Sequence, residues 1–471
     1  MKFYNSETKK IEEFVPIESG KVKIYTCGPT VYSYAHVGNF RAYIMEDALI
    51  RALEFLGYQV ERIMNITDVG HLTGDNDYGQ DRMLKAAAAE HKSVLEIAKF
   101  YTDAFLQDFK LLGLKEPKAF VPATQCIDTY IEIITKLLEK GYAYLSGGNV
   151  YYDTSKLKEY YRFGNQNAND NLVGVREGVE EDKGKHNQND FVLWFTKSKF
   201  EDQALKWDSP WGLGYPGWHI ECSGISYKYL GERLDIHCGG VDNIFPHHTN
   251  EIAQTEGFVG HKWCNYWFHV NRLNAGDGEK MSKSLGNVYT ITQLAQMGYN
   301  PMVYKLFNFL SHYRNQLAFS LEGMDAAKNT YNKLLKRIAG LAKTKEGINK
   351  EAYDKYYTQF ADALSNDLNT SLAITTVFDV LKAEINDSTK VKLILKFDEM
   401  LNLGFTDVIN NGLPTEEIES DLRTYIETQI EKRNEAKKNR DFALADKIRA
   451  ELSEKGIELV DTKEGTKYHK K

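Results

Sequence analysis

The segment between residues 22 and 66 constrains the fold of this chain more than any other part of it. Residues 22–27 alternate apolar and aromatic side chains, which is typical of a β-strand, and a Gly-Pro pair ends the run. From about Asn39, apolar residues recur at helical spacing as far as Gly57, and a second strand follows at 60–66. A strand, a helix and a strand in this order predict a βαβ unit and therefore a parallel sheet.

Parallel sheets of this kind bind ligands beyond the carboxyl ends of their strands. Cys27 stands at the end of the first predicted strand, and Thr67 comes directly after the second. We therefore expect both side chains at the ligand-binding edge of the sheet.

The rest of the chain predicts a mixed region followed by a helical one. We expect helices over 93–140, strands at 150–152 and 191–195 around a polar loop at 164–190, and core strands at 234–238 and 267–270. Further helices are expected near 325–343, 351–365, 370–385 and 389–403, and two more after a turn at 410–414, with Asp441 capping the second. The predicted fold class is α/β, with an α+β insertion and an α-helical C-terminal region.

Composition excludes several classes of protein. Of 471 residues, 42 % are hydrophobic and 27 % are charged, which rules out a disordered or collagen-like chain. No stretch reaches the roughly 18 apolar residues of a membrane span, and the N-terminus lacks the apolar core of a signal peptide. Five scattered cysteines favour free thiols or metal ligands over disulfides. We therefore expect a cytoplasmic protein of about three domains that contacts no membrane.

The charge is unevenly distributed along the chain. The whole sequence has a net charge of −7, which argues weakly against a nucleic-acid partner. Residues 432–471, however, hold 12 Lys and Arg against 8 Asp and Glu. Such a basic tail is compatible with a nucleic-acid contact, although on charge alone a solvated helical face is the commoner explanation.

Two short motifs indicate phosphate chemistry. The sequence H-V-G-N at 36–39 stands at a predicted helix start, where the helix N-terminus attracts anions, Gly38 permits close approach and His36 can donate a hydrogen bond. The sequence K-M-S-K-S at 280–284 follows a Gly-containing stretch, and its lysines suit charge that develops on a phosphate. Alone, the first motif occurs often by chance, and the second could be a solvated basic loop.

Together these motifs resemble those of the class I aminoacyl-tRNA synthetases, and the chain as a whole resembles the cysteinyl-tRNA synthetase family within that class. Three features depart from the family pattern: Asn39 and Thr249 replace a usual histidine and a usual glutamate, and the loop at 69–81 differs. The segments that carry the closer resemblance are 25–32, 65–68, 216–222, 235–237, 245–248 and 433–444.

The resemblance implies a domain organisation. A Rossmann-like parallel-sheet catalytic domain would comprise two halves, 1–115 and 216–320, separated by an inserted connective domain at 116–215. A helical tRNA/anticodon-stem domain at 321–412 and a small anticodon-binding domain at 413–471 would follow.

Four residues form a candidate metal site. Thiolate, imidazole and carboxylate are all zinc ligands, and His247 and Glu251 are four apart, so on a helix they share a face. Buried free cysteines and a helical pair would explain the same residues without a metal. The resemblance implies that one Zn²⁺ is held by Cys27, Cys222, His247 and Glu251.

Two neighbouring residues are weaker candidates. His248 could replace His247 as a ligand, and we rank it second because it stands three residues before Glu251. Cys238 is expected to be a buried strand residue.

A zinc ion would explain how cysteine is selected over serine. A hydrophobic pocket discriminates such small differences poorly, whereas zinc binds a thiolate strongly and a hydroxyl weakly. No editing domain is then needed. The substrate thiol would either add as a fifth ligand or displace a weak one, most plausibly Glu251, and the sequence leaves both possibilities open.

The remaining site residues follow from the resemblance alone. Thr67 and Trp218 match positions that flank the amino-acid substrate. Gly239, Gly240 and Asp242 match an adenosine-binding segment, although Asp242 could instead be a simple helix cap. Gly38 and Lys283 would also bind ATP, which brings Mg²⁺ with it. The implied catalytic residues are His36, Asn39, Lys280 and Lys283.

The predicted function is ligation of cysteine to tRNA. Cysteine and ATP would form cysteinyl-adenylate, and the cysteine would pass to tRNA(Cys), held by the helical region and the basic tail of a monomer. Three alternatives remain: a ligase that transfers cysteine to an amino-sugar, an inactive tRNA-binding paralogue, and a nucleotidyltransferase acting on a small substrate. The C-terminal region argues against the first, and the intact K-M-S-K-S motif and full ligand set argue against the second. The third leaves the ligand set and the long C-terminal region unexplained.

Overall fold

The computed structural model comprises two compact units, Met1–Ile409 and Asn410–Lys471, each described here by itself. Among the described helices, none is both long and apolar enough to cross a membrane. The structure describes residues 1–69, 83, 86–87, 93–157, 160, 162–163, 184–197, 205–276, 288–342, 346–413, 420–438, 441–454, 457–462 and 465–470.

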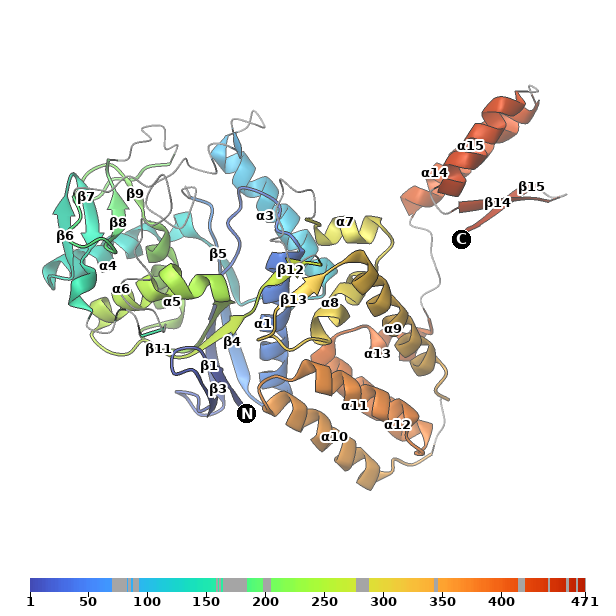
Figure 1. Cartoon of the computed structure of the whole chain (residues 1–471), viewed down its shortest axis with the longest axis horizontal. Helices are drawn as coiled ribbons and strands as arrows, with labels where there is room; N and C mark the ends of the chain where they lie inside the picture. The colour runs from blue at the N-terminus through green and yellow to red at the C-terminus, as the bar shows by residue number, and fades with distance from the viewer. Residues whose placement is uncertain are drawn as a thin grey trace. The chain divides into compact units, whose positions relative to one another are not determined.

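Five parallel strands form the central sheet of the first unit (Figure 1). Their order across the sheet is β11 (Cys264–Val270), β10 (Leu234–Gly240), β3 (Lys21–Thr26), β4 (Gln59–Ile66) and β5 (Ala119–Pro122). Helix α1 (Val37–Phe55) joins β3 to β4. The parallel sheet and the βαβ unit predicted from residues 22–66 are therefore confirmed, as are the strands expected at 234–238 and 267–270.

Both faces of this sheet are buried, as parallel sheets require. Ile24 and Met64 face the core that contains α1 and the later helices. Tyr25 and Ile63, one residue away on the same strands, belong to a second core on the opposite face. This alternation explains why β3 and β4 contain apolar residues on both faces.

The prediction that residues 93–140 are helical is wrong in the middle of this range. Helices α3 (Val94–Leu111) and α4 (Ile127–Glu139) are separated by β5, the edge strand of the central sheet, and by a short 3₁₀ helix, Ala123–Cys126. Strand β5 has only four residues, too few to display an alternating pattern, and it becomes a strand because it pairs with the end of β4. This pairing also places 119–122 in the central sheet rather than in the insertion.

A small antiparallel sheet stands between the two parts of the central sheet in sequence (Figure 1). The strands expected at 150–152 and 191–195 are confirmed, while two short strands that flank them had no clear pattern. The sheet contains β6 (Ala143–Ser146), β7 (Asn149–Tyr152), β8 (Phe191–Phe195) and β9 (Tyr215–Pro216). Helix α5 (Trp218–Leu230) then returns the chain to β10, and α6 (Thr249–Val259) joins β10 to β11.

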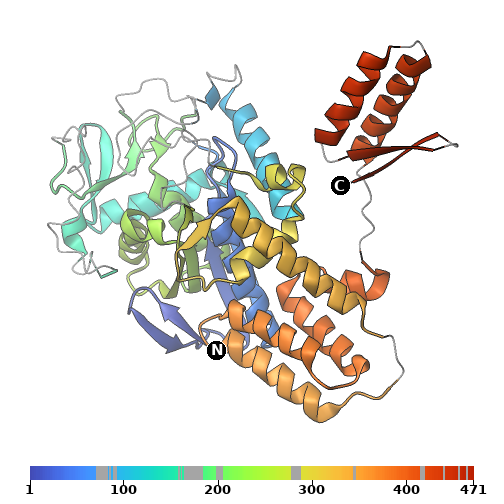
Figure 2. The same ribbon diagram turned by 45° about the vertical axis from the view of Figure 1, so that its right-hand side comes forward.

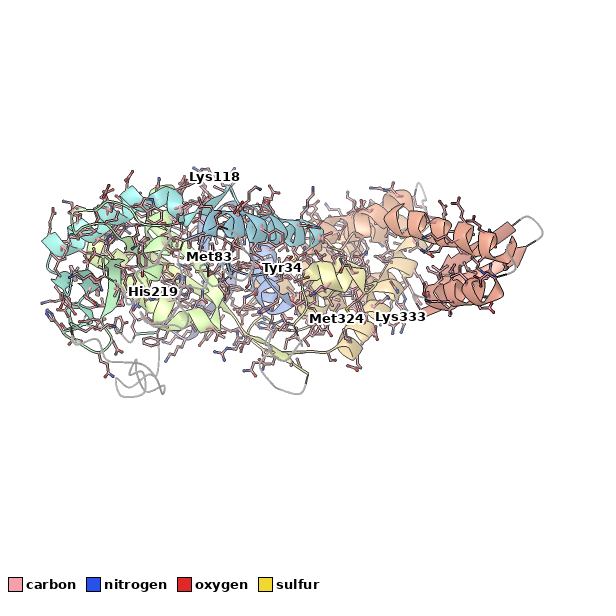
Figure 3. The ribbon with its side chains drawn as sticks, turned by 90° about the horizontal axis from the view of Figure 1, so that it is seen from above. Tyr34, Met83, Lys118, His219, Met324 and Lys333 are labelled. Carbon is pink, nitrogen blue, oxygen red and sulfur yellow. The ribbon has the colours of Figure 1, made fainter. Side chains whose placement is uncertain are left out.

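The later part of the first unit is helical (Figure 2). All four helices expected between 325 and 403 are confirmed, and Met324 and Lys333 mark the first of them in Figure 3. The helices are α7 (Ile291–Gln296), α8 (Pro301–Phe309), α9 (Leu321–Ala339), α10 (Lys350–Ser365), α11 (Thr370–Lys382), α12 (Asp387–Leu401) and α13 (Phe405–Asn411). The remaining strands of this unit are β1 (Lys2–Asn5), β2 (Lys10–Glu13), β12 (Leu273–Ala275) and β13 (Leu317–Phe319).

The second unit contains two helices and a hairpin. Both expected helices are confirmed, as α14 (Ser420–Lys438) and α15 (Phe442–Glu454), and Asp441 Oδ1 accepts the Leu444 amide 3.0 Å away, as a helix cap does. The antiparallel pair β14 (Ile457–Thr462) and β15 (Gly465–Lys470) was not predicted. This unit has its own small core, formed by Ile426, Ile430, Ile448, Leu452, Ile457 and Leu459.

Candidate active site

A cavity of ≈ 760 Å³ opens at the carboxyl ends of the central strands. The loop after β3, the start of α1 and the end of β10 line it, and so do eight of the residues singled out in the sequence. These residues are Cys27, His36, Gly38, Asn39, Trp218, Gly239, Gly240 and Asp242. A second cavity, of ≈ 900 Å³, lies at the amino ends of the strands and contains none of them.

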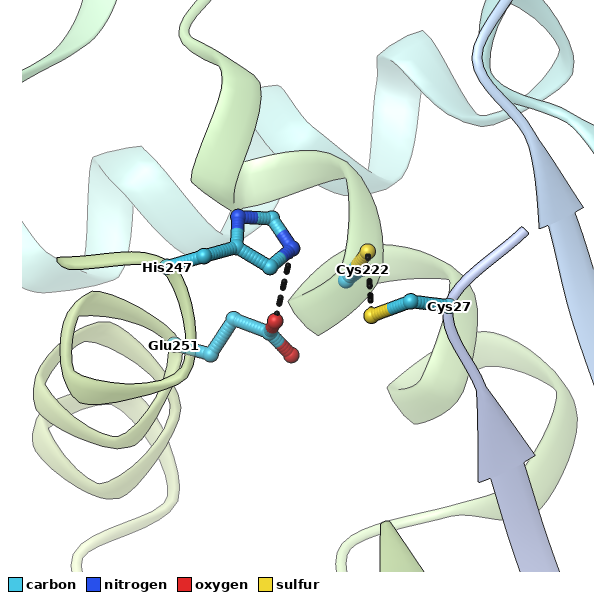
Figure 4. A group of neighbouring side chains, drawn as sticks. All are labelled: Cys27, Cys222, His247 and Glu251. Atoms are coloured by element: carbon cyan, nitrogen blue, oxygen red, sulfur yellow. Dashed lines mark hydrogen bonds and ion pairs between the residues drawn. The ribbon is translucent and has the colours of Figure 1, made fainter. Parts of the chain in front are cut away.

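The four candidate metal ligands meet beside this cavity (Figure 4). Their ligating atoms all lie within 4.8 Å of one another. Cys27 directly follows β3, Cys222 lies in α5, His247 precedes α6 and Glu251 is in its first turn. The two sulfur atoms are 4.0 Å apart, and His247 Nε2 is 2.9 Å from Glu251 Oε1.

The donor set suits a zinc ion. Two thiols, an imidazole and a carboxylate are typical zinc donors. Burial raises the pKa of both Cys27 and Cys222, so a nearby cation is needed to hold them as thiolates. Burial alone would also raise the pKa of Glu251, but His237 and His247 outweigh it, and the net pKa is lowered. Glu251 is therefore already a carboxylate.

A second layer of histidines surrounds these residues. His237 Nε2 lies 2.8 Å from Glu251 Oε2, and His248 Nε2 lies 3.4 Å from Cys27 Sγ. His248 also contacts His269, with 2.7 Å between the two ring nitrogens. These contacts form a second possible ligand set, which comprises Cys27, His237, His248 and Glu251. His248 thus remains a geometric alternative to His247.

Sequence reasoning gave no role to His237 and His269. The signal for them was a histidine within a mostly apolar strand, and each of these strands also contains another polar residue, Asp235 or Asn265. Cys238, in contrast, is fully buried in β10 and belongs to neither ligand set, which confirms the expectation for that residue.

His36 caps helix α1 through a reciprocal pair of hydrogen bonds with Asn39. The Asn39 amide donates to His36 Nδ1 at 3.3 Å, and the His36 amide donates to Asn39 Oδ1 at 3.0 Å. Because Nδ1 accepts a hydrogen bond, neutral His36 carries its proton on Nε2. The donor that His36 can present to a phosphate is therefore Nε2–H.

The end of β10 forms another wall of the cavity. A Cβ on Gly239 would lie 2.8 Å from His248 Cε1, so only glycine fits there. Asp242 forms an ion pair with Arg272, and both side chains are more than half exposed. Asp242 lies inside the short helix Val241–Asn243 rather than at its N-cap, so the helix-cap alternative is wrong.

The two residues expected to flank an amino-acid substrate differ in exposure. Trp218 lines the cavity and stacks on His247, with 4.3 Å between ring centroids. Thr67 is only 1 % exposed and does not line the cavity. Its hydroxyl accepts a hydrogen bond from Asn65 and donates one to Glu221. Lys280, Lys283 and the loop from residue 70 to 81 lie outside the described residues.

Comparison with known proteins agrees with the resemblance that the sequence motifs indicated. Residues 13–329 match the family model described as tRNA synthetases class I (C) catalytic domain. A cysteine–tRNA ligase of Treponema denticola is 43 % identical, covering 100 % of this chain and 99 % of the relative. One from Borreliella burgdorferi is 41 % identical, covering 99 % of each.

Solved structures support the same fold. The Mycobacterium tuberculosis methionyl-tRNA synthetase in complex with methionyl-adenylate matches with a TM-score of 0.54 at 15 % identity, covering 82 % of this chain and 90 % of that one. At this identity the likeness concerns the fold alone, which is the α/β, Rossmann-like arrangement predicted from the sequence. With the family match and the full-length relatives, it shows that this chain belongs to the cysteine–tRNA ligases, a family of class I aminoacyl-tRNA ligases.

Proposed function

We propose that this protein joins cysteine to ATP as cysteinyl-adenylate and transfers the cysteine to tRNA(Cys), and that Zn²⁺ selects the thiol substrate. The observation that carries the proposal is the meeting of Cys27, Cys222, His247 and Glu251 beside the cavity at the carboxyl ends of the sheet. When bound there, Zn²⁺ supplies a soft Lewis acid that favours a thiolate over the hydroxyl of serine.

The nucleotide would occupy the wall formed by α1 and the end of β10. His36 Nε2–H and the N-terminus of α1 bind phosphate oxygens, while Gly38, Gly239 and Gly240 permit close approach of the nucleotide. Asp242 accepts hydrogen bonds from the ribose hydroxyls after it leaves Arg272. Lys280 and Lys283 stabilise charge on the phosphates, and Mg²⁺ accompanies ATP.

The chemistry requires mainly positioning. The cysteine carboxylate attacks the α-phosphate of ATP and pyrophosphate leaves. The terminal ribose hydroxyl of the tRNA then attacks the carbonyl carbon of the adenylate, losing its proton as AMP leaves. The catalytic halves, 1–115 and 216–320, would hold the small substrates. Residues 116–215 connect the two halves: they supply β5 to the central sheet and otherwise form the inserted connective domain. Residues 321–412 and 413–471 would hold the tRNA of a monomeric enzyme.

Charging of total tRNA tests the proposal. The purified protein is given ATP with cysteine or serine, before and after chelation of the metal. We expect charging with cysteine only, loss of charging on chelation and recovery with Zn²⁺. A Cys126→Ser variant is the control. Cys126 is buried outside both ligand sets, so the charging of this variant and its response to chelation should match those of the unaltered protein. Cysteine-dependent pyrophosphate exchange without tRNA charging would contradict tRNA as the acceptor of the cysteine and would favour an amino-sugar acceptor.

A further inference from the structure

A directed series of hydrogen bonds runs from β3 to α5. The Gly28 amide donates to Asn65 Oδ1 at 2.7 Å. A backbone amide only donates, so Asn65 must turn its carbonyl oxygen to Gly28 and its NH₂ group to Thr67, where Nδ2 and Oγ1 are 3.1 Å apart. Thr67 therefore accepts from Asn65 and gives its single proton to Glu221 Oε2, 2.8 Å away.

Glu221 ends this series with one oxygen unused. The side chain is 1 % exposed, and no described residue forms a hydrogen bond with its Oε1 atom. Buried carboxylate oxygens in proteins are nearly always hydrogen-bonded. The described residues therefore leave one oxygen of Glu221 able to accept a further hydrogen bond.

Thr67 and Glu221 lie directly behind the cavity wall. The Thr67 amide donates to the Pro29 carbonyl at 3.0 Å, and the Val31 amide donates to the Thr67 carbonyl at 3.1 Å. Pro29 lines the cavity, and so does Trp218, which stands one helical turn before Glu221 in α5. The pair therefore adjoins the part of the cavity that lies next to the metal ligands.

We propose that Glu221 is a positioning residue that makes Thr67 an acceptor for the ammonium group of the amino-acid substrate. Because the Thr67 proton is committed to Glu221, Thr67 can offer a substrate only a lone pair. Glu221 Oε1, which has no hydrogen-bond partner among the described residues, is a second oxygen beside it. Thr67 thus presents an acceptor and no proton, which suits an ammonium group and disfavours a carboxylate, since a carboxylate itself only accepts.

One group of the substrate matches the acceptor oxygens of Thr67 and Glu221. The proposal rests on cysteine being the substrate: its thiol would go to the metal ligands and its carboxylate must face ATP. The ammonium group is the part that remains, and it is the only cationic donor in the molecule.

Two fragments of cysteine provide the test. Cysteamine has the thiol and the ammonium group but no carboxylate, and 3-mercaptopropionate has the thiol and the carboxylate but no ammonium group. Both are used as inhibitors of cysteine-dependent pyrophosphate exchange by the full chain. For Glu221→Gln we expect the KM for cysteine and the Ki for cysteamine to rise at least tenfold. The Ki for 3-mercaptopropionate, the KM for ATP and the bound zinc should not change.

A second pair of variants tests whether Glu221 acts through Thr67. Thr67→Val should weaken cysteamine as Glu221→Gln does, the double variant should be no weaker than either single one, and Thr67→Ser should restore binding. The exposed Glu232→Gln, just after α5, is the matched control. These variants keep the test valid if Glu221→Gln does not fold.

The outcomes separate this inference from the proposed function. Equal weakening of both fragments, loss of zinc, or no change in either Ki would overturn the role of Glu221. An unaltered protein without cysteine-dependent exchange would instead contradict the proposed function itself.

Discussion

At the scale of single residues, His36 combines a structural role with a chemical one. The side chain caps α1 through Nδ1, and this contact leaves Nε2–H as the donor. Asn39 Oδ1 accepts a hydrogen bond from the His36 amide. The last position of the H-V-G-N motif is thus part of the helix cap.

Removing the Asn39 side chain should therefore affect catalysis more than stability. We expect Asn39→Ala to lower the free energy of unfolding by about 1 kcal/mol, the usual value of one such hydrogen bond, and to slow adenylate formation at least tenfold. Glu96→Ala removes the equivalent contact from the cap of α3, where Glu96 Oε2 accepts the Ser93 amide at 2.8 Å. Denaturant unfolding and pyrophosphate exchange measure both effects. Equal exchange rates in the two variants would contradict the role of Asn39.

The cysteine ligands should make metal binding depend on pH. Burial raises the pKa of Cys27 and Cys222 above the ordinary value. Burial alone would lower the pKa of His247, but Glu251 and Cys222 raise it to about 10, so protons compete with the metal at all three residues throughout the neutral range. The metal affinity should therefore fall as the pH falls from about 8 to about 6. Glu251, whose pKa is lowered, stays ionised there and adds nothing to the change. Competition with a chelator at several pH values measures the slope, and a flat profile would argue against thiolate ligands.

Loss of one thiol should remove the metal and the activity together. Cys222→Ser leaves three ligand residues and replaces a strong donor by a weak one, so we expect most bound zinc and cysteine activation to be lost. Metal analysis and pyrophosphate exchange are measured on the same sample. Retained zinc with normal activation would show that Cys222 is not a ligand.

The residues of this site could be predicted only in part. The spacing of His247 and Glu251 indicated a shared helix face, but nothing local joined them to Cys27 or Cys222, and only the family resemblance did so. His237 and Glu221 were given no role, because each matters through a contact with a residue distant in sequence.

At the scale of secondary-structure elements, β4 lies so close to the chain at the end of β3 that position 28 has no space for a side chain. A Cβ on Gly28 would lie 1.7 Å from the Asn65 carbonyl oxygen, which cannot move without separating the two strands. We expect Gly28→Ala to destabilise the protein by about 3 kcal/mol and to weaken metal binding, because Cys27 is adjacent. Gly347→Ala is the control, since nothing lies within 4 Å of that position. Thermal unfolding and metal content provide the measurements, and a stable Gly28→Ala variant with full metal content would contradict this account.

Prediction from sequence succeeded for elements whose pattern is long enough to read. Helix α1 has 19 residues and strands β3 and β4 have six and eight, so their mostly apolar runs are long enough to be recognised. Strand β5 has four residues and β9 has two, so their pairing partners rather than their own patterns make them strands.

At the scale of the whole molecule, the two units have separate cores. The central sheet and its cavity belong entirely to the first unit. The second unit encloses its own apolar cluster and contains the basic segment 432–471, with a net charge of +4. The whole unit has a net charge of −1, because residues 410–431 hold six Asp and Glu against one Arg. The positive charge that suits contact with RNA is therefore confined to the segment 432–471.

The separation of the units predicts how a shortened chain behaves. A chain that ends after Leu413 retains α13 and every described site residue, so cysteine-dependent pyrophosphate exchange should stay within about threefold of the full chain. Charging of tRNA should fall at least tenfold, because the shortened chain lacks the basic segment 432–471 that would contact the polyanion. The loss of charging should appear mainly as a higher KM for tRNA. High salt should reduce the difference in this KM between the two chains, because it weakens tRNA binding by the full chain more than by the shortened one. Equal loss of exchange and charging would mean that the second unit supports the catalytic one instead of the tRNA.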